Sequence, residues 1–365
     1  MGAAGVRSEN NLPNPVLGRN TLFDGIFRGH LDIMRFLLDS GADMEAADFC
    51  SFTPRDLAFQ RVNTACPPEL AEHLRTLFRL DEVPDDLELT TVHRIVLGMT
   101  TLDLGEYLSE HPPEVNKPDL LGRTPLWWAV RRDDATKSHT LLARGADPNI
   151  ANAAGRSPLH NAAAQGNLGL VDALLKHSAD VHQRSFEGKT PLHVVGVYGI
   201  REDVLIVQRL LDSGAEIDAQ DSYGRTAISL CCFDSHAEIA QLLLERGADL
   251  TVPDAHGWFP WHWAIYDGAA RIVERYLTHG DCDLGAVVDG GGTVLHFMVE
   301  RCTAEQVVDA MLAIADMSMI DPDAKDSRGK TASENLEERW SLDVSVYQLD
   351  EKLGRMIDKA ARPRD

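Results

Sequence analysis

The chain has 365 residues and a net charge of −22, from 35 basic and 57 acidic side chains. This balance disfavours partners such as nucleic acids and anionic membranes, because both are bound by cationic surfaces. The six cysteines form no C-x-x-C pair and show no zinc-site spacing, and no apolar run is long enough to span a bilayer. We therefore expect an intracellular protein, cytoplasmic with the nucleus left open.

The N-terminal third contains irregular repeats. Residues 1–19 are predicted to be an irregular lead-in, and a first repeat over 20–52 contains Gly41-Ala42-Asp43 after its second helix. A second repeat, 53–89, opens at Thr53-Pro54 but is broken by Cys66-Pro67-Pro68, and a third begins near Thr90. Residues 20–121 are therefore predicted to be a degenerate part of an array.

The regular part begins at Gly122, where one short motif recurs. Thr124-Pro125-Leu126, Ser157-Pro158-Leu159-His160 and Thr190-Pro191-Leu192-His193 begin 33 residues apart. A fixed period of this size is typical of a stacked array, in which each repeat buries its apolar face against its neighbours.

Each position of the repeat has a physical role. Thr or Ser is suited to the N-cap of a helix, and Pro to its first turn. A second helix is predicted from paired leucines such as Leu174-Leu175, and Gly145 can take the left-handed conformation that ends a helix.

Further repeats are predicted to begin at 226, 259, 293 and 331. The pattern is regular over 122–300 and degenerate over 301–345. An amphipathic stretch from about Val346 to Ala361 is predicted to be a capping helix within a C-terminal segment, 346–365.

These residues closely resemble the ankyrin repeat, and Val92 to Leu97 with the repeat that follows is similar to the multi-repeat intracellular ankyrin proteins common in fungi. The resemblance implies an all-α ankyrin-repeat solenoid over 20–345, with stacked helix–turn–helix units and β-hairpin fingers. We expect about nine to ten repeats.

No catalytic motif is found. His160, His193, His262 and His296 occupy the fourth position of the motif, where the ankyrin resemblance implies a structural role. A loop containing His279 and Cys282 matches no metal-site spacing. We therefore predict no enzyme activity, no cofactor and no metal.

The resemblance also implies a concave face made of the fingers and the first helices. Trp, Tyr and Arg, which are enriched at binding hot spots, gather at positions assigned to that face. The predicted partner-binding residues are Trp128, Arg131, Arg132, Phe186, Tyr198, Tyr223, Phe233, Trp258, Trp263 and Tyr266. Trp127 and Trp261, by contrast, are expected to fold inward.

The predicted function is a non-catalytic scaffold that binds a partner protein or an extended peptide in the concave groove. One alternative is a small-molecule binder or enzyme that uses the aromatic groove as a pocket, served by the motif histidines and by Asp234 or Asp267. A second is that the chain is the sensing part of a larger protein. A basic residue follows the finger glycine in five repeats, which also suggests contact with an acidic peptide; these residues are Arg123, Arg156, Lys189, Arg225 and Lys330.

Overall fold

The structure is a computed structural model, in which two compact units span Met1–Glu187 and Gly188–Asp365. It describes residues 21–44, 53–55, 58, 62, 67–78, 88–195, 203–231, 236–266, 268–279, 282–287, 292–302, 305–314, 320–342 and 347–361. The predicted lead-in, Tyr198, Phe233, Asp234 and Asp267 lie outside these residues.

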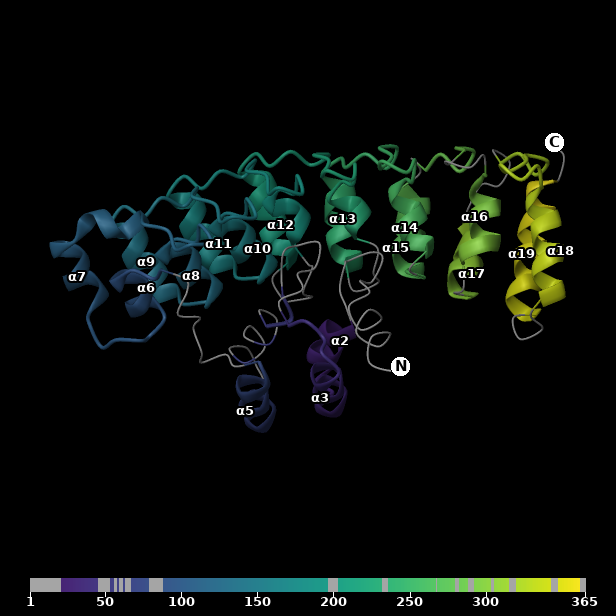
Figure 1. Cartoon of the computed structure of the whole chain (residues 1–365). Helices are drawn as coiled ribbons and strands as arrows, with labels where there is room; N and C mark the ends of the chain where they lie inside the picture. Colours follow the sequence, from purple (N-terminus) through teal and green to yellow (C-terminus); the bar gives the residue numbers. More distant parts are fainter. Residues whose placement is uncertain are drawn as a thin grey trace. The chain divides into compact units, whose positions relative to one another are not determined.

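The first unit is built from helix pairs (Figure 1). Its elements are α2 (Thr21–Arg28), α3 (Leu31–Asp39), α5 (Pro68–Leu77), α6 (Thr91–Val96), α7 (Leu104–Glu110), the short 3-10 helix η2 (Pro112–Asn116), α8 (Pro125–Arg131), α9 (Ala135–Ala143), α10 (Pro158–Ala164) and α11 (Leu168–Lys176). The first helices of successive repeats, α6, α8 and α10, pack in one row, and α7, α9 and α11 pack in a second.

The second unit repeats this two-row plan. It comprises η3 (Pro191–Val194), α12 (Asp203–Asp212), η4 (Ile228–Leu230), α13 (Ala237–Glu245), α14 (Pro260–Tyr266), α15 (Ala270–His279), α16 (Val294–Arg301), α17 (Glu305–Ile314), α18 (Ala332–Leu342) and α19 (Tyr347–Ala360). One row runs through η4, α14, α16 and α18, and the other through α12, α13, α15, α17 and α19. The helix predicted near the C-terminus is thus present as α19, which packs on α16, α17 and α18.

The expected helix caps are present. Thr90, Ser157, Thr190 and Thr293 each form a capping box with the residue three positions later, which in every case is histidine. Thr124, whose repeat has Trp127 in place of histidine, accepts a hydrogen bond from the Trp127 N–H at 3.2 Å. The motif positions therefore fix where the first helices begin.

Tight turns join the repeats. We call five of them fingers: the 119 finger (Asp119–Arg123), the 152 finger (Asn152–Arg156), the 221 finger (Asp221–Arg225), the 254 finger (Asp254–Trp258) and the 326 finger (Asp326–Lys330). In each, Oδ1 of the first residue accepts two backbone N–H groups, from the residues two and four positions later. These are hydrogen-bonded turns, and the described residues contain no β-strand where hairpins were predicted.

Adjacent fingers also bond to each other. In the second unit the Ala255 N–H donates to the Tyr223 carbonyl at 2.8 Å, which fixes the register of the 254 finger on the 221 finger. Gly224 has φ 76°, and a Cβ there would lie 2.7 Å from Ala255 N. Only glycine both adopts this positive φ readily and lacks the Cβ that would collide with the next finger.

Two first helices are shorter than the motif predicts. η3 ends at Val194 and η4 spans three residues, Ile228–Leu230. β-Branched residues have lower helix propensity, and Val194-Val195 is followed by Gly196, which is poorer still. The number of repeats stays a prediction.

Candidate interaction surface

The structure places the predicted site residues in three kinds of environment. Trp128, Arg132, Trp258, Trp263 and Tyr266 are half-buried. Phe186 and Tyr223 are exposed, with 79% and 42% of their surface accessible. Arg131 is buried, 4% exposed, and is not part of the accessible surface.

Arg131 is buried because it ends a short helix against the next repeat. It is the last residue of α8, and its carbonyl accepts a 2.7 Å hydrogen bond from the Gln165 side chain of the following repeat. The prediction of inward tryptophans is confirmed: Trp127 is 7% and Trp261 2% exposed.

Three predicted residues of the second unit meet in one place. The ring centroids of Trp258 and Trp263 lie 4.8 Å apart, and those of Trp258 and Tyr266 5.9 Å apart. Behind them lies Phe297, which is 6% exposed and has its centroid 4.9 Å from that of Trp258. We call Trp258, Trp263 and Tyr266 the tryptophan cluster. It combines a buried neighbour, Phe297, with three half-buried aromatic side chains, as binding anchors do.

Asp254 holds this cluster in place, and the sequence analysis missed it. Its Oδ1 accepts the backbone N–H groups of His256 and Trp258, and its Oδ2 accepts the Trp263 indole N–H at 3.0 Å. Asp254 is 8% exposed. The sequence contains a pattern that could have revealed this contact. Asp254 lies nine residues before Trp263, and the same spacing separates Asp119 from Trp128 and Asp326 from Asn335.

The 119 finger shows the same contact with one change. The Trp128 indole N–H donates to Asp119 Oδ2 at 3.0 Å, and Arg123 Nε donates to the same oxygen at 2.8 Å. Arg123 Cζ lies 4.3 Å from the centroid of the Trp128 ring. The guanidinium therefore neutralises the carboxylate and covers the indole.

The proposed contact of the basic finger residues with an acidic peptide is wrong for those the structure buries. Arg156 and Lys189 are each 3% exposed and Arg225 is 6% exposed. Arg225 forms an ion pair of 2.8 Å with Asp221 of its own finger. Arg156, Lys189 and Arg225 are therefore not available to a partner, and the predicted basic column is not continuous.

The motif histidines have structural contacts. His193 Nδ1 accepts the Thr190 N–H at 3.1 Å, and its Nε2 donates to the Arg225 carbonyl oxygen at 3.1 Å. His93 and His296 make the same Nε2 contact, with Arg123 and Lys330 respectively. Each links the start of one helix to the end of the next finger, as expected for a structural histidine.

Burial strongly affects two of these histidines. Desolvation lowers the pKa of His193 to about 4 and that of His262 to about 3. His262 lies among aromatic rings, with its centroid 3.5 Å from Trp261 and 4.9 Å from Phe297. Both imidazoles are therefore neutral at pH 7.

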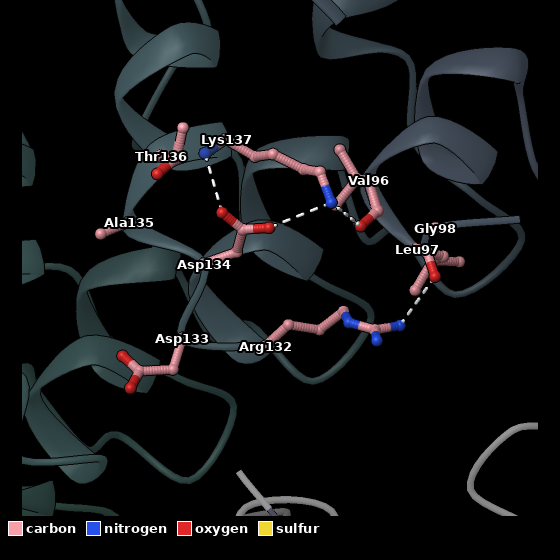
Figure 2. Close-up of a pocket in the computed structure, with 9 residues that line it drawn as sticks. All are labelled: Val96, Leu97, Gly98, Arg132, Asp133, Asp134, Ala135, Thr136 and Lys137. Carbon is pink, nitrogen blue, oxygen red and sulfur yellow. Dashed lines mark hydrogen bonds and ion pairs between the residues drawn. The ribbon is translucent and has the colours of Figure 1, made fainter. Parts of the chain in front are cut away.

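A pocket of about 540 Å³ lies between α6 and α9 in the first unit (Figure 2). Lys137 Nζ donates to the Val96 carbonyl at 3.0 Å, and Arg132 donates to the Leu97 carbonyl at 3.0 Å. Lys137 also pairs with Asp134 at 3.0 Å. Because these cations cap the C-terminal end of α6, we assign them a role in joining two repeats.

Other chemical features of the described residues are structural. Cys231 is buried, and burial raises the pKa of its thiol to about 12, so it packs as an inert thiol. No group of three potential metal ligands occurs in the part of the chain that the structure describes. In that same part, no helix combines the length and apolarity needed to cross a bilayer.

Comparison with protein families agrees with this geometry. Residues 121–153 match the model of the ankyrin repeat, residues 141–195 match ankyrin repeats in many copies, and residues 197–287 match ankyrin repeats in three copies. No curated protein matches the chain. The helix pairs, capping boxes and fingers define a helical repeat protein. The chain is an ankyrin repeat protein, and ankyrin repeats are generally protein–protein interaction modules.

Proposed function

We propose that this chain is a non-catalytic scaffold that binds a partner protein, through an extended segment of that partner laid across the fingers and first helices. The tryptophan cluster is the main anchor in the second unit. The observation that carries the proposal is that Trp258, Trp263 and Tyr266 stay half-buried and are not fully covered, although each packs against another ring of the cluster.

Tyr223 extends this anchor. It is exposed, and its carbonyl accepts the Ala255 N–H of the neighbouring 254 finger. Its ring is held by Arg225, whose Cζ lies 4.8 Å from the ring centroid. Two successive fingers thus present aromatic side chains that are already ordered, which lowers the entropy lost on binding.

We also propose a cytoplasmic location. The free thiol of Cys231 supports it, because reduced cysteines are typical of a reducing compartment.

The test is affinity capture from extract with three versions of the chain: wild type, Tyr266→Ala and Phe36→Ala. Phe36 is a matched control, because it is an aromatic residue of the first unit that is 64% exposed and lies outside the predicted site. We expect a protein partner that is retained by wild type and Phe36→Ala and lost from Tyr266→Ala. A partner retained equally by all three would exclude the tryptophan cluster as its anchor.

A further inference from the structure

The fingers differ in how the carboxylate of their first residue is neutralised. Asp119 pairs with Arg123, Asp221 with Arg225, and Asp326 with Arg328. In the 254 finger, the position that holds arginine in the first two of these is occupied by Trp258. Among the described residues, no ion pair reaches Asp254, whose oxygens accept only uncharged N–H groups.

The missing cation leaves an unusual combination of groups. In the 119 finger, the guanidinium covers the face of Trp128. In the 254 finger, the ring of Trp258 packs on Trp263 instead, and the Asp254 carboxylate, which has no ion pair among the described residues, accepts the Trp263 indole N–H. Aromatic faces and a nearby negative charge both attract a cation.

The surrounding sequence adds to this potential. Residues 202–324 contain 22 acidic and six basic side chains, whereas residues 117–201 contain seven acidic and 11 basic ones. The negative charge of the protein is therefore concentrated in the region that carries the tryptophan cluster. A basic partner would be drawn to it, and an acidic partner would be repelled.

We propose that the tryptophan cluster binds an arginine side chain of an extended basic segment in the partner protein. The guanidinium stacks on the accessible indole and phenol faces, as Arg123 stacks on Trp128 within this chain. The inference rests on the proposed function and names the chemistry of the partner segment.

The probe is a fluorescein-labelled, unstructured peptide of alternating glycine, serine and arginine. Its binding to the protein is measured by fluorescence anisotropy at low salt. Two further peptides replace arginine with citrulline, which keeps the shape but lacks the charge, or with glutamate. We expect the arginine peptide to bind at least about tenfold more tightly than the citrulline peptide. The glutamate peptide should not bind.

Trp258→Arg is the decisive variant, because it gives the 254 finger the arginine that the 119 finger has. It should supply the cation from within the chain and weaken the arginine peptide about tenfold. The matched control is Leu205→Arg, which adds the same charge to the same unit at a residue that is 49% exposed on α12. We expect it to weaken binding less than about twofold, through long-range charge alone.

Circular dichroism checks the folding of each variant. If Trp258→Arg does not fold, Tyr266→Ala carries the test, with an expected loss of about threefold to tenfold against Phe36→Ala. Equal binding of the arginine and citrulline peptides would overturn the inference. So would equal effects of Trp258→Arg and Leu205→Arg.

The two proposals fail in different ways. A captured protein that needs Tyr266 but competes with none of the peptides would leave the scaffold function standing and exclude the arginine. A captured protein that is indifferent to Tyr266 would exclude the anchor itself.

Discussion

The 119 and 254 fingers have the same backbone but different surfaces. In both, a buried aspartate accepts two backbone N–H groups and a tryptophan indole at 3.0 Å. The residue after the finger glycine differs: Arg123 closes the first site with an ion pair, and Trp258 leaves the second without one. The residue at this one position of a shared turn, Arg123 or Trp258, thus distinguishes a turn whose charges are paired internally from a candidate binding anchor.

The comparison also shows why an aromatic residue at a given repeat position is not by itself a binding residue. Trp128 and Trp263 occupy the same place after the capping motif and bond to equivalent carboxylates. Trp128 is covered by a guanidinium of its own finger, whereas Trp263 packs against Trp258 and Tyr266. The neighbours of each tryptophan determine its role.

The largest expected effect tests whether the two aspartates differ in charge pairing. Asp119→Asn should lower the free energy of unfolding by about 3 kcal/mol, because Arg123 is left largely buried without its counter-ion. Asp254→Asn should cost less, about 1–2 kcal/mol, because the amide oxygen still accepts the two backbone N–H groups and no ion pair is lost, although the Trp263 indole N–H loses its acceptor.

Urea unfolding of both variants gives the comparison. Asn152 already occupies this position in the 152 finger, which shows that the turn accepts asparagine. Equal losses from the two substitutions would mean that Asp254 has a counter-ion of its own.

A second prediction concerns acid. The pKa values of His193 and His262 are lowered to about 4 and about 3 in the folded protein, against 6.5 for an ordinary histidine. The unfolded chain therefore binds more protons below pH 6.5, and stability falls as the pH drops towards the folded values. The slope approaches about 1.4 kcal/mol per pH unit for each histidine.

Urea unfolding between pH 7 and pH 4.5 measures this slope. His193→Gln should flatten it, since glutamine does not titrate, even if the variant is less stable at pH 7. An unchanged slope in His193→Gln would show that other groups cause the acid sensitivity.

A smaller effect is expected at the 221 finger. Tyr223→Ala should destabilise the protein by about 0.5–1 kcal/mol, because Arg225 loses the ring on which it packs but keeps its ion pair with Asp221. Thermal melting measures the change. A loss comparable to that of Asp119→Asn would show that Tyr223 belongs to the core and not to the surface.

The smallest effect is expected at Phe186. Its side chain is 79% exposed, and the hydrogen bond from its backbone N–H to the Ala154 carbonyl does not depend on the ring. Phe186→Ala should change the free energy of unfolding by less than about 0.5 kcal/mol. A melting curve clearly shifted from wild type would place the ring in a packed contact.

Much of the fold was predictable because it depends on local interactions. The capping Thr, the following Pro and the motif histidine act within one turn of helix, so their spacing identifies the repeats and the inward side of Trp127 and Trp261. The ends of the helices were less predictable. η3 stops early where Val194, Val195 and Gly196 weaken the helix, and η4 spans only Ile228–Leu230.

The candidate site was predicted only in part, because it depends on contacts between turns and helices. The spacing identified Trp258, Trp263 and Tyr266 as neighbours of the same surface, but it did not show that Asp254 orients one of them. It also placed Arg131 on the surface, although the next repeat covers it. Burial by a neighbouring repeat is a tertiary effect that a motif position does not encode.

The most direct test of the account is the response of individual indole groups to the arginine peptide. Two-dimensional ¹⁵N–¹H NMR resolves the side-chain N–H of each tryptophan, and Trp→Phe variants assign them. We predict saturable shifts of the Trp258 and Trp263 signals, with those of the buried Trp127 and Trp261 nearly unchanged. Binding that shifts other signals and leaves Trp258 and Trp263 in place would contradict the account.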